Sequence, residues 1–573
     1  MRYPKLKSRP AVRQMVDVFR GYNHNLRIGQ GEFYDMENMT SDAFPVLCPR
    51  GSRGIWRAPA SPQGLIARDR LCYVDGSAFV LGDTRVELGL STDPQDCPKD
   101  LVSMGAWVII LPDKYYINTL DPEDHGPIEA RFQSQGQVKL YPCSAQGDAV
   151  SPVVSGEAPA EAAEGSLWLD TSASPALLKR RTADGWITQE STWVRLEAPG
   201  IGTGFAPGDG ITLRGIPALE GSCVIKDRGE DFLILPGLLE EAATQDSVSA
   251  ERTMPVMDFL VESGNRLWGC RYGTDAEGRV VNQIYTSKLG DFKNWNVFQG
   301  ISTDSYAASC GSEGPFTGAC SHLGHPLFFR ETCLHRVYGT YPGNFQIQTT
   351  GCRGVQRGCG DSLAIVGETL YYKAPGAVCA YDGAFPVEVS RDLGEERYSN
   401  AAAGALGNKY YISMMDAGGR WHLFVYDTVR GLWHREDGLQ AGSFAAFQGE
   451  LYCIDRQRQN ILALLGTGEP EEAPVRWMAE TGELGLDSPN RKTIRSITLR
   501  LALDRGAALE VFAQYDRSGV WEQLCHIRGT DLQSFAVPIR PRRCDHLKLR
   551  FAGRGMGRIY SWTETIEEGS DLP

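Results

Sequence analysis

Short runs of apolar and aromatic residues, each bounded by glycine, proline, asparagine or aspartate, recur along the whole chain. Such runs of about four to eight residues between turn residues are typical of β-strands. Long segments with the roughly 3.6-residue apolar period of an amphipathic helix are hard to find. Glycine and proline occur 64 and 31 times, which fits a chain with many turns. The pattern predicts an all-β protein.

The second half of the chain repeats one unit, a glycine turn that leads into an apolar and aromatic strand. The turn glycines are Gly264, Gly324, Gly367, Gly407 and Gly449. The last three intervals are about 40 to 43 residues, and one four-stranded blade of a β-propeller takes about 40–45 residues. Similar units occur at 68–82 and 104–118. Together they predict a roughly seven-bladed β-propeller.

A ring of small twisted sheets is stable because each sheet face is covered by a neighbour and only short edges remain. A series of β-sandwiches and a β-helix are alternative interpretations of the repeat. A β-helix would show a much shorter period, so the spacing favours the propeller.

Composition marks the segments outside the repeat. Residues 150–165 are rich in proline, alanine and glutamate and lead into short strands, which indicates an inserted small β module. After the acidic linker 468–474, apolar and polar residues alternate, for example at Leu499, Leu501 and Leu503, and this predicts a C-terminal β-sandwich. The expected domains are an N-terminal extended arm (1–60), a first part of the propeller (61–127), the inserted β module or modules (128–254), a second part of the propeller (255–467) and the C-terminal sandwich (468–573).

Composition also excludes some function classes. The net charge of −13 argues against a broad surface that neutralises nucleic acid. The basic segments 178–181 and 540–550 are interpreted as solvated strand faces. The fifteen cysteines are scattered without a CxxC pair, so we expect buried thiols rather than disulfides or a zinc ribbon. The sequence shows neither a secretory signal nor a membrane span.

The segment 264–300 contains the first candidate site. Within it, SKLGDFKNW (287–295) resembles the Asp-box of sialidases, SxDxGxTW, but Leu289 stands at the position of the acid and the tryptophan comes late. An Asp-box is structural even when it is complete. We therefore favour a hairpin stabilised by Trp295 packed beneath the turn over a sugar site.

Other candidate residues lack the partner residues, at the required spacing, that catalysis or metal binding needs. A glycosidase needs two carboxylates at a defined separation, and we interpret the acids of the repeat as solvated turn acids. The loop GIGTGF (200–205) lacks the βαβ unit of a dinucleotide site, the histidines lack metal-ligand spacing, and two cysteines of a glycine-rich loop lack a nearby histidine. These residues are Asp291, Asp304, Asp382, Glu396, His322, His325, His422, His434, Cys352 and Cys359. We expect no catalytic residue, no metal and no cofactor.

Parts of the chain resemble a known family. Residues 22–54, YNHNLRIGQGEFYDMENMTSDAFPVLCPRGSRG, are similar to the opening of virion proteins of tailed phages and prophages. Later segments resemble the blade series of phage tail-hub or packaged-DNA stabilisation proteins. They are NRLWG (265–269), IYTSKLGDFKNWNVF (284–298), GPFTG (314–318), LFFRETCLHRVYG (327–339) and GCRGV (351–355). WLDTS (168–172) with LLKRRTADGW (177–186) also resembles small modules of phage fibres.

The resemblance implies a non-enzymatic structural component of a phage or prophage tail or connector. Such a component would lie in the virion, assemble with other virion proteins as a homo-oligomeric ring and contact DNA in the tail channel. The arm before residue 60 would dock on a neighbouring subunit or, equally, close the first blade as a strand. The alternative is a carbohydrate-binding or carbohydrate-active propeller, which paired acids and exposed tryptophans on one propeller face would favour.

Overall fold

The computed structural model describes residues 11–275, 278–485 and 491–568, so the first ten residues of the expected arm and parts of the expected sandwich lie outside it. Within these ranges the chain forms strands and turns and no α-helix, which confirms the all-β expectation. Four short 3-10 helices occur: η1 (Pro94–Asp96), η2 (Pro342–Asn344), η3 (Gly360–Ser362) and η4 (Arg391–Leu393). No helix in the described ranges could span a membrane.

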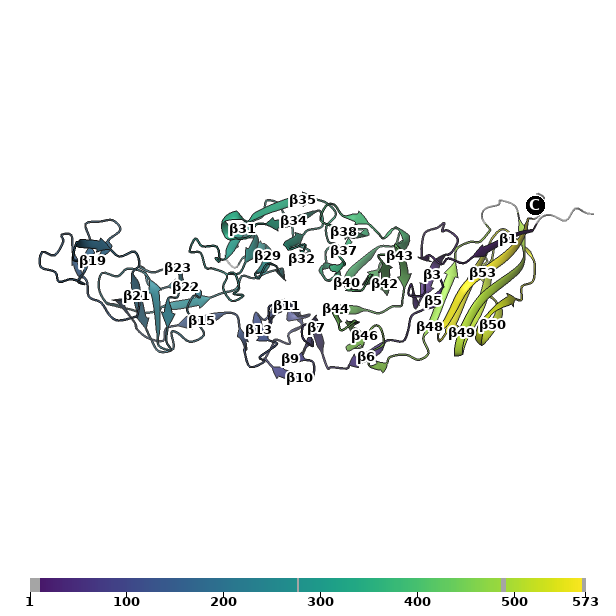
Figure 1. Ribbon diagram of the computed structural model, residues 1–573, viewed down its shortest axis with the longest axis horizontal. Coiled ribbons are helices and arrows are strands. Elements are labelled where there is room, and N and C mark those ends of the chain that lie inside the picture. Colours follow the sequence, from purple (N-terminus) through teal and green to yellow (C-terminus); the bar gives the residue numbers. More distant parts are fainter. Residues whose placement is uncertain (1–10, 276–277, 486–490, 569–573) are drawn as a thin grey trace, which may run out of the picture.

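Figure 1 shows an elongated molecule, with the insert at one end, a group of small sheets in the middle and the C-terminal strands at the other end. The small sheets are antiparallel and follow one another in chain order. Two precede the insert: β7 (Pro62–Ala67), β8 (Leu71–Asp75), β9 (Ala78–Leu81) and β10 (Thr84–Glu87), then β11 (Asp100–Met104), β12 (Trp107–Leu111), β13 (Tyr115–Asn118) and β14 (His125–Pro127).

The remaining small sheets follow the insert. Three have four strands each: β28 (Phe259–Glu262), β29 (Leu267–Thr274), β30 (Val280–Thr286) and β31 (Tyr306–Ser309); β32 (Gly318–His322), β33 (His325–Phe329), β34 (Cys333–Tyr338) and β35 (Gln346–Gly351); β36 (Ala364–Val366), β37 (Thr369–Ala374), β38 (Ala377–Tyr381) and β39 (Val387–Glu388). Two more groups of strands complete the series: β40 (Tyr398–Leu406), β41 (Lys409–Asp416), β42 (Trp421–Asp427) and β43 (Leu432–Arg435); β44 (Ala441–Phe447), β45 (Glu450–Asp455) and β46 (Asn460–Ala463).

The first strands of these sheets contact one another in a cyclic order. β7 contacts β11, β11 contacts β28, β28 contacts β32, β36 contacts β40, β40 contacts β44, and β44 returns to β7; η3 contacts both β32 and β40. Apolar cores fill the spaces between neighbouring sheets, as where Leu65 and Tyr73 meet Tyr452 and Ile454. The result is a β-propeller-like ring whose first strands form its inner side.

The N-terminal segment is paired within the chain. β6 (Gly54–Arg57) adds an outer strand to β46, so the beginning of the chain completes the last sheet and not the first sheet, where one interpretation of the arm placed it. The other described strands of the segment also have partners in the chain. β1 (Ala11–Val16) pairs with β53 (Gly557–Glu568), β2 (Gly21–Tyr22) with β43, β3 (Glu32–Glu37) with β48 (Arg476–Thr481), and β4 (Met39–Thr40) with β5 (Cys48–Pro49). Docking of the arm on a neighbouring subunit stays a prediction.

The insert contains three sheets. Two of them share one apolar core: β15 (Ala130–Gln133), β27 (Ser249–Arg252), β22 (Gly210–Arg214) and β23 (Gly221–Val224) face β24 (Asp227–Arg228), β25 (Phe232–Pro236), β21 (Trp193–Glu197), β16 (Val138–Cys143) and β26 (Ala243–Gln245). The third consists of β17 (Val153–Ser155), β18 (Leu167–Asp170), β19 (Leu177–Thr182) and β20 (Gly185–Thr188). The buried Asn294 of the ring joins the insert, because its Nδ2 donates to Asp209 at 2.9 Å and its Oδ1 accepts from the Gly210 N–H at 2.8 Å.

The C-terminal strands are β47 (Glu469–Pro470), which pairs with β6, then β48, β49 (Lys492–Tyr515), β50 (Glu522–Val537), β51 (Arg543–Cys544), β52 (Leu547–Arg554) and β53. The long strand β49 pairs with β53 along its first half, with β52 along its second half and with β50 along most of its length. Leu499, Leu501, Leu547 and Leu549 are fully buried. The apolar residues of the alternating segment therefore point into the core.

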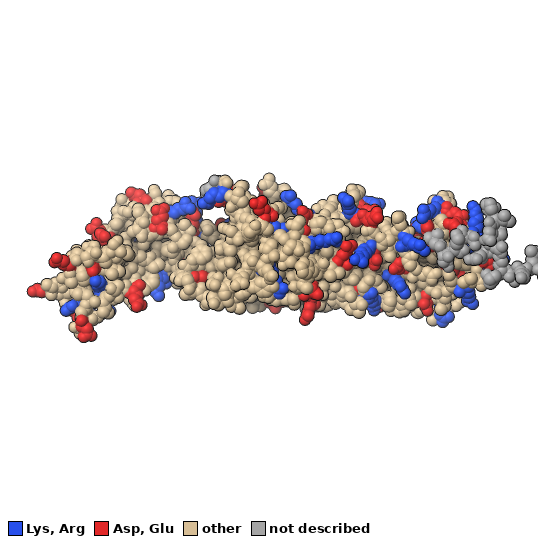
Figure 2. Space-filling view, turned by 90° about the horizontal axis from the view of Figure 1, so that it is seen from above, with Lys and Arg blue, Asp and Glu red and all other residues tan. Residues whose placement is uncertain are grey.

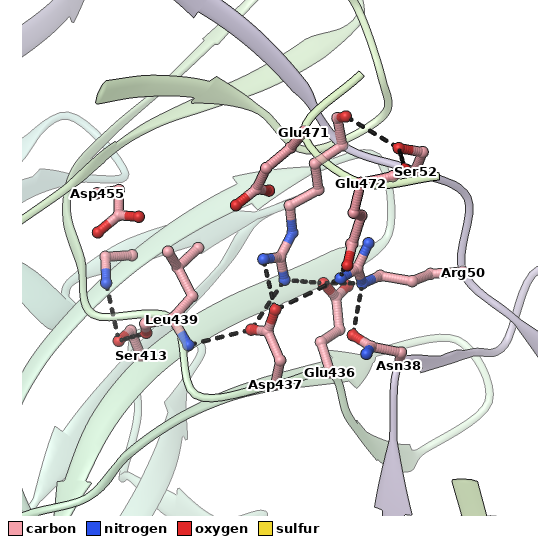
Figure 3. Close-up of polar contacts among 12 residues, drawn as sticks. Asn38, Arg50, Ser52, Ser413, Glu436, Asp437, Leu439, Asp455, Glu471 and Glu472 are labelled. Atoms are coloured by element: carbon pink, nitrogen blue, oxygen red, sulfur yellow. Dashed lines mark hydrogen bonds and ion pairs between the residues drawn. The ribbon is translucent and has the colours of Figure 1, made fainter. Parts of the chain in front are cut away.

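A buried group of charges joins the N-terminal segment to the last sheets of the ring (Figure 3). This group, the clasp, consists of Arg50, Arg53, Glu436, Asp437 and Glu472. The Arg53 side chain is 1% exposed, and its Nη2 and Nη1 lie 2.7 Å from Glu436 Oε2 and 2.7 Å from Asp437 Oδ2. Arg50 Nη2 lies 2.5 Å from Glu472 Oε1. Each buried cation thus faces carboxylates, which offsets the cost of removing the charges from water.

Candidate active site at the inner rim of the ring

Two acidic side chains lie on the inner side of the ring. Asp100 is the first residue of β11, and Asp361 belongs to η3, which contacts β32 and β40 just before β36 begins. Both residues are exposed to solvent. Arg456, from the turn between β45 and β46, places its Nη2 at 3.5 Å from Asp361 Oδ2. Asp100, Asp361 and Arg456 together are called the inner-rim group.

Protein surrounds both carboxylates although water reaches them. Burial and, second to it, the charge of Asp361 raise the pKa of Asp100 to about 6. Burial also raises the pKa of Asp361, and the neighbouring Arg456 charge opposes that rise. Both side chains nevertheless remain exposed to solvent, and that of Asp361 is 64% exposed. Asp361 has a cation beside it, whereas Asp100 has an anion.

Two carboxyl groups in unlike surroundings can divide the roles of acid and base. Asp100 retains its proton to a higher pH and is suited to donate it. Asp361, with Arg456 beside it, is suited to act as the ionised carboxylate. Hydrolysis of a glycosidic bond uses such a pair. Among the described residues, no group of three or more His, Cys, Asp and Glu side chains could hold a metal ion.

The acids singled out from the sequence are not brought together. Asp304 accepts hydrogen bonds from three successive backbone N–H groups of its own loop. Asp291 accepts one from Asn294, and Asp382 accepts one from the backbone two residues further on. Glu396 is exposed on the loop before β40. The first three side chains brace turns, as the favoured interpretation expected, although Asp304 is only 4% exposed and is therefore not a solvated acid.

The segment that resembles an Asp-box forms a packed turn. Leu289, at the position of the missing acid, is 39% exposed at the turn, while Trp295 is 4% exposed. Trp295 packs with Tyr116 and Leu267 between two sheets of the ring, and its Nε1 donates to the Phe292 carbonyl at 3.0 Å. This is the packing that the structural interpretation of the hairpin predicted.

Each histidine singled out from the sequence has its own local partner or surroundings. A ring nitrogen of His322 lies 2.7 Å from the Glu368 carbonyl oxygen, and one of His325 lies 3.1 Å from the Val337 carbonyl oxygen. His422 Nε2 lies 2.9 Å from Asp416 Oδ2. Burial lowers the pKa of His434 to about 3, which keeps this imidazole neutral.

The cysteines and the loop GIGTGF also have structural surroundings. Burial raises the pKa of the Cys352 thiol to about 11 and raises that of Cys359, so neither forms a thiolate readily. All fifteen cysteines are free thiols. Residues 200–205 form successive turns in the insert, where a side chain at Gly202 would collide with the Gly229 carbonyl oxygen.

Sequence reasoning missed the inner-rim group. Asp100 stands directly before the strand segment LVSM, and Asp361 follows the turn GCG. Both acids therefore precede, or stand at the start of, the first strand of a repeating sheet. The units were aligned on their turn glycines, which lie between the first and second strands. The shared position of the two acids is visible in the sequence, but it does not set them apart from other acidic residues that precede a strand.

No protein-family model and no curated protein matches the chain. Solved structures that it resembles include an exo-β-1,3-galactanase from Phanerochaete chrysosporium, with 8% identity over 53% of this chain and 94% of that chain and a TM-score of 0.22. A phage phi92 endosialidase has 10% identity, coverage of 74% and 68%, and a TM-score of 0.25. A puromycin hydrolase has 11% identity, coverage of 75% and 61%, and a TM-score of 0.25.

The expectation of a non-enzymatic component of a phage tail or connector is corrected by these findings. The similar structures reported above are named as a galactanase, an endosialidase and a puromycin hydrolase, and none of these names is that of a tail-hub or connector protein. The exclusion of an enzyme is corrected for the same reason. At such low identities and TM-scores the likeness itself identifies no activity, so the residues have to carry the assignment. The homo-oligomeric ring, the virion partners and the location in a virion stay predictions.

Proposed function

We propose that the chain is a carbohydrate-active propeller protein whose inner-rim group hydrolyses a glycosidic bond. The observation that carries the proposal is the meeting of Asp100 of β11 and Asp361 of η3 on the inner side of the ring, where burial raises the pKa of both acids and the charge of Asp361 adds to the rise at Asp100. Solvated turn acids would show neither the raised pKa values nor the influence of a neighbouring acid. Paired acids and exposed tryptophans were the two features expected of a carbohydrate-active propeller. The paired acids are present, whereas none of the twelve tryptophans is exposed.

The proposed step assigns one role to each residue. Asp100 donates its proton to the oxygen of the leaving sugar as the bond to the anomeric carbon breaks. Asp361 accepts a proton from a water molecule, whose oxygen forms the new bond to that carbon. The Arg456 charge favours the ionised form of Asp361 between turnovers. The proton lost by Asp100 equals the proton gained by Asp361, so the pair returns to its starting state through solvent.

We also infer a finer description of the fold. The ring is a seven-bladed propeller that β6 closes by adding the outer strand of the last blade, and the support for this is the cyclic order of contacts among the first strands. The strands β48 to β53, with β1 and β3, form a C-terminal β-sandwich. Its support is β49, which leaves the partner β53 for the partner β52 halfway along and so passes from one sheet to another.

The test is a reducing-sugar assay of the full-length chain on a panel of neutral and acidic polysaccharides. Asp100→Asn and Asp361→Asn should each lower the rate by about 10²–10⁴-fold, the usual contribution of a general acid or base. Asp382→Asn is the matched control, because it changes an acid that only braces a turn. Activity should decline as the pH rises above about 6, where Asp100 loses its proton. Absence of turnover on the whole panel, or equal rates for all three variants, would refute the proposal.

A further inference from the structure

A groove on the C-terminal strands gathers arginine side chains. Its volume is about 810 Å³, and its lining includes Arg476, Arg505, Arg528 and Arg554. All four residues are exposed, and no hydrogen bond or ion pair of their guanidinium groups occurs among the described residues. Other arginines of the molecule face carboxylates, as Arg53 does in the clasp. In the view of Figure 2, by contrast, positive and negative side chains are interspersed along the surface.

The strand register places three of these arginines in one row. Arg476 of β48 stands opposite Arg554 of β52, Arg554 stands opposite Ala508 of β49, and Ala508 stands opposite Arg528 of β50. Residues directly opposite one another in antiparallel strands point to the same face. The next residues of β48 and β52 point inward, since Trp477 is buried and a side chain at Gly553 would collide with its ring. The row therefore lies on the outer face.

Like charges directly opposite one another destabilise a sheet. Adjacent strands lie about 4.8 Å apart, so Arg476 and Arg554 are about one strand width apart and Arg528 follows about two widths beyond Arg554. The small side chain of Ala508 lies between Arg554 and Arg528 and leaves room above the sheet. An unfavourable row of this kind is explained if an anionic ligand neutralises it.

The neighbouring row distinguishes the type of anion. Two residues along, Ala552 stands opposite Glu510, and Glu510 stands opposite His526, whose Nδ1 lies 3.4 Å from Glu510 Oε1. A carboxylate would repel a phosphodiester backbone, which offers only acceptors along its length. It would accept hydrogen bonds from sugar hydroxyl groups, while the guanidinium groups bind carboxylates or sulfates in their planar fork geometry.

We propose that this groove binds an acidic polysaccharide, with the arginine row on its carboxylate or sulfate groups and Glu510 on its hydroxyl groups. The site belongs to the C-terminal strands and is separate from the inner-rim group (Figure 1). It does not depend on hydrolysis, because binding is measured directly. The overall charge of −13 fits a local groove better than a general affinity for polyanions.

Calorimetric titration of the full-length chain with polysialic acid, dextran sulfate, neutral dextran and single-stranded DNA tests the proposal. Arg528→Ala with Arg554→Ala should weaken binding of an acidic polysaccharide by about ten- to hundredfold, since two charge-assisted contacts are lost. Polysialic acid and dextran sulfate separate carboxylate from sulfate as the preferred group. The control is Arg180→Ala with Arg214→Ala, which removes the same charge from two exposed arginines of the insert and should leave the affinity unchanged.

The variants also report on folding. Because the row is repulsive without ligand, Arg554→Ala should melt at a temperature no lower than that of the parent chain. The double substitution Arg528→Lys with Arg554→Lys keeps the positive charges but removes the planar guanidinium groups that donate two parallel hydrogen bonds. This variant should bind with an affinity between those of the parent chain and the double alanine variant. Binding of neutral dextran equal to that of the acidic chains would overturn the proposal, as would tighter binding of DNA, equal loss in both double alanine variants, or no binding of either acidic polysaccharide.

Discussion

The clasp and the inner-rim group are both built from arginine and acidic side chains, yet their charges are satisfied to different degrees. In the clasp, the buried Arg53 makes two short contacts to Asp437 and one to Glu436. In the inner-rim group, one ion pair of 3.5 Å links Arg456 to Asp361, and Asp100 faces a like charge without a cation. The clasp contributes to structure, because breaking it leaves charges buried and unpaired. The inner-rim group holds charges in an unfavourable state, which is common at active sites.

The substitution expected to have the largest effect on stability is Arg53→Met. It leaves Glu436 and Asp437 without their main cation, so it should lower the free energy of unfolding by about 3–5 kcal/mol. The control Arg57→Met removes an arginine whose side chain is 42% exposed and pairs with the exposed Asp83. That exposed pair should contribute less than about 1 kcal/mol. If thermal denaturation gave the same loss for both variants, the distinction between the clasp with its buried arginines and an ordinary surface pair would fail.

Asp437→Asn should have a smaller effect that depends on pH. Burial by itself would raise the pKa of Asp437, but the charge and hydrogen bonds of Arg53 outweigh it and hold the pKa below the usual 3.8. A lowered pKa means that the ionised carboxylate stabilises the fold above pH 3.8 and that this contribution is lost as the pH falls through the folded value. The variant should therefore be less stable by about 1–3 kcal/mol at pH 7. Denaturation at pH 7 and pH 3 should show the gap narrowing; a constant gap would contradict the assignment.

The smallest effect is expected for Asp100→Asn, and it should have the opposite sign. Because the pKa of Asp100 is raised to about 6, the folded state binds a proton more tightly than the unfolded chain, and ionisation costs stability as the pH rises from 3.8 through 6. The variant should match the parent near pH 3.5 and exceed its melting temperature at pH 8 by about 1–2 °C, since solvent screens an exposed group. A variant that melts below the parent at pH 8 would place Asp100 with the structural charges.

The regularities visible in the sequence were those that depend on neighbouring residues. The alternation at Leu499 and Leu501 agrees with the burial of both side chains, since successive strand residues point to opposite faces. Turn glycines marked the turns between the first and second strands of the sheets, and the missing acid at Leu289 correctly indicated a packed hairpin. The inner-rim group was missed because no local pattern sets Asp100 apart from the other acidic residues that precede a strand. The resemblance to virion scaffold proteins rested on turn and strand patterns, which carry no information about catalytic groups.

The sequence by itself determined that the chain is all-β, that small sheets repeat through its middle and that alternating strands follow at its end. The tertiary structure decided which strands from the N-terminal segment complete which sheets and which distant charges meet. Arg53 reaches Asp437 because β6 joins the last sheet of the ring. The charge of Asp361 raises the pKa of Asp100 because β11 and η3 both lie on the inner side of the ring. The three arginines of the groove form a row through the register of four strands. Side-chain alternation is a local property of a strand. The contacts between distant charges depend instead on pairing between segments far apart in the chain, and the local sequence of one segment does not specify its partner.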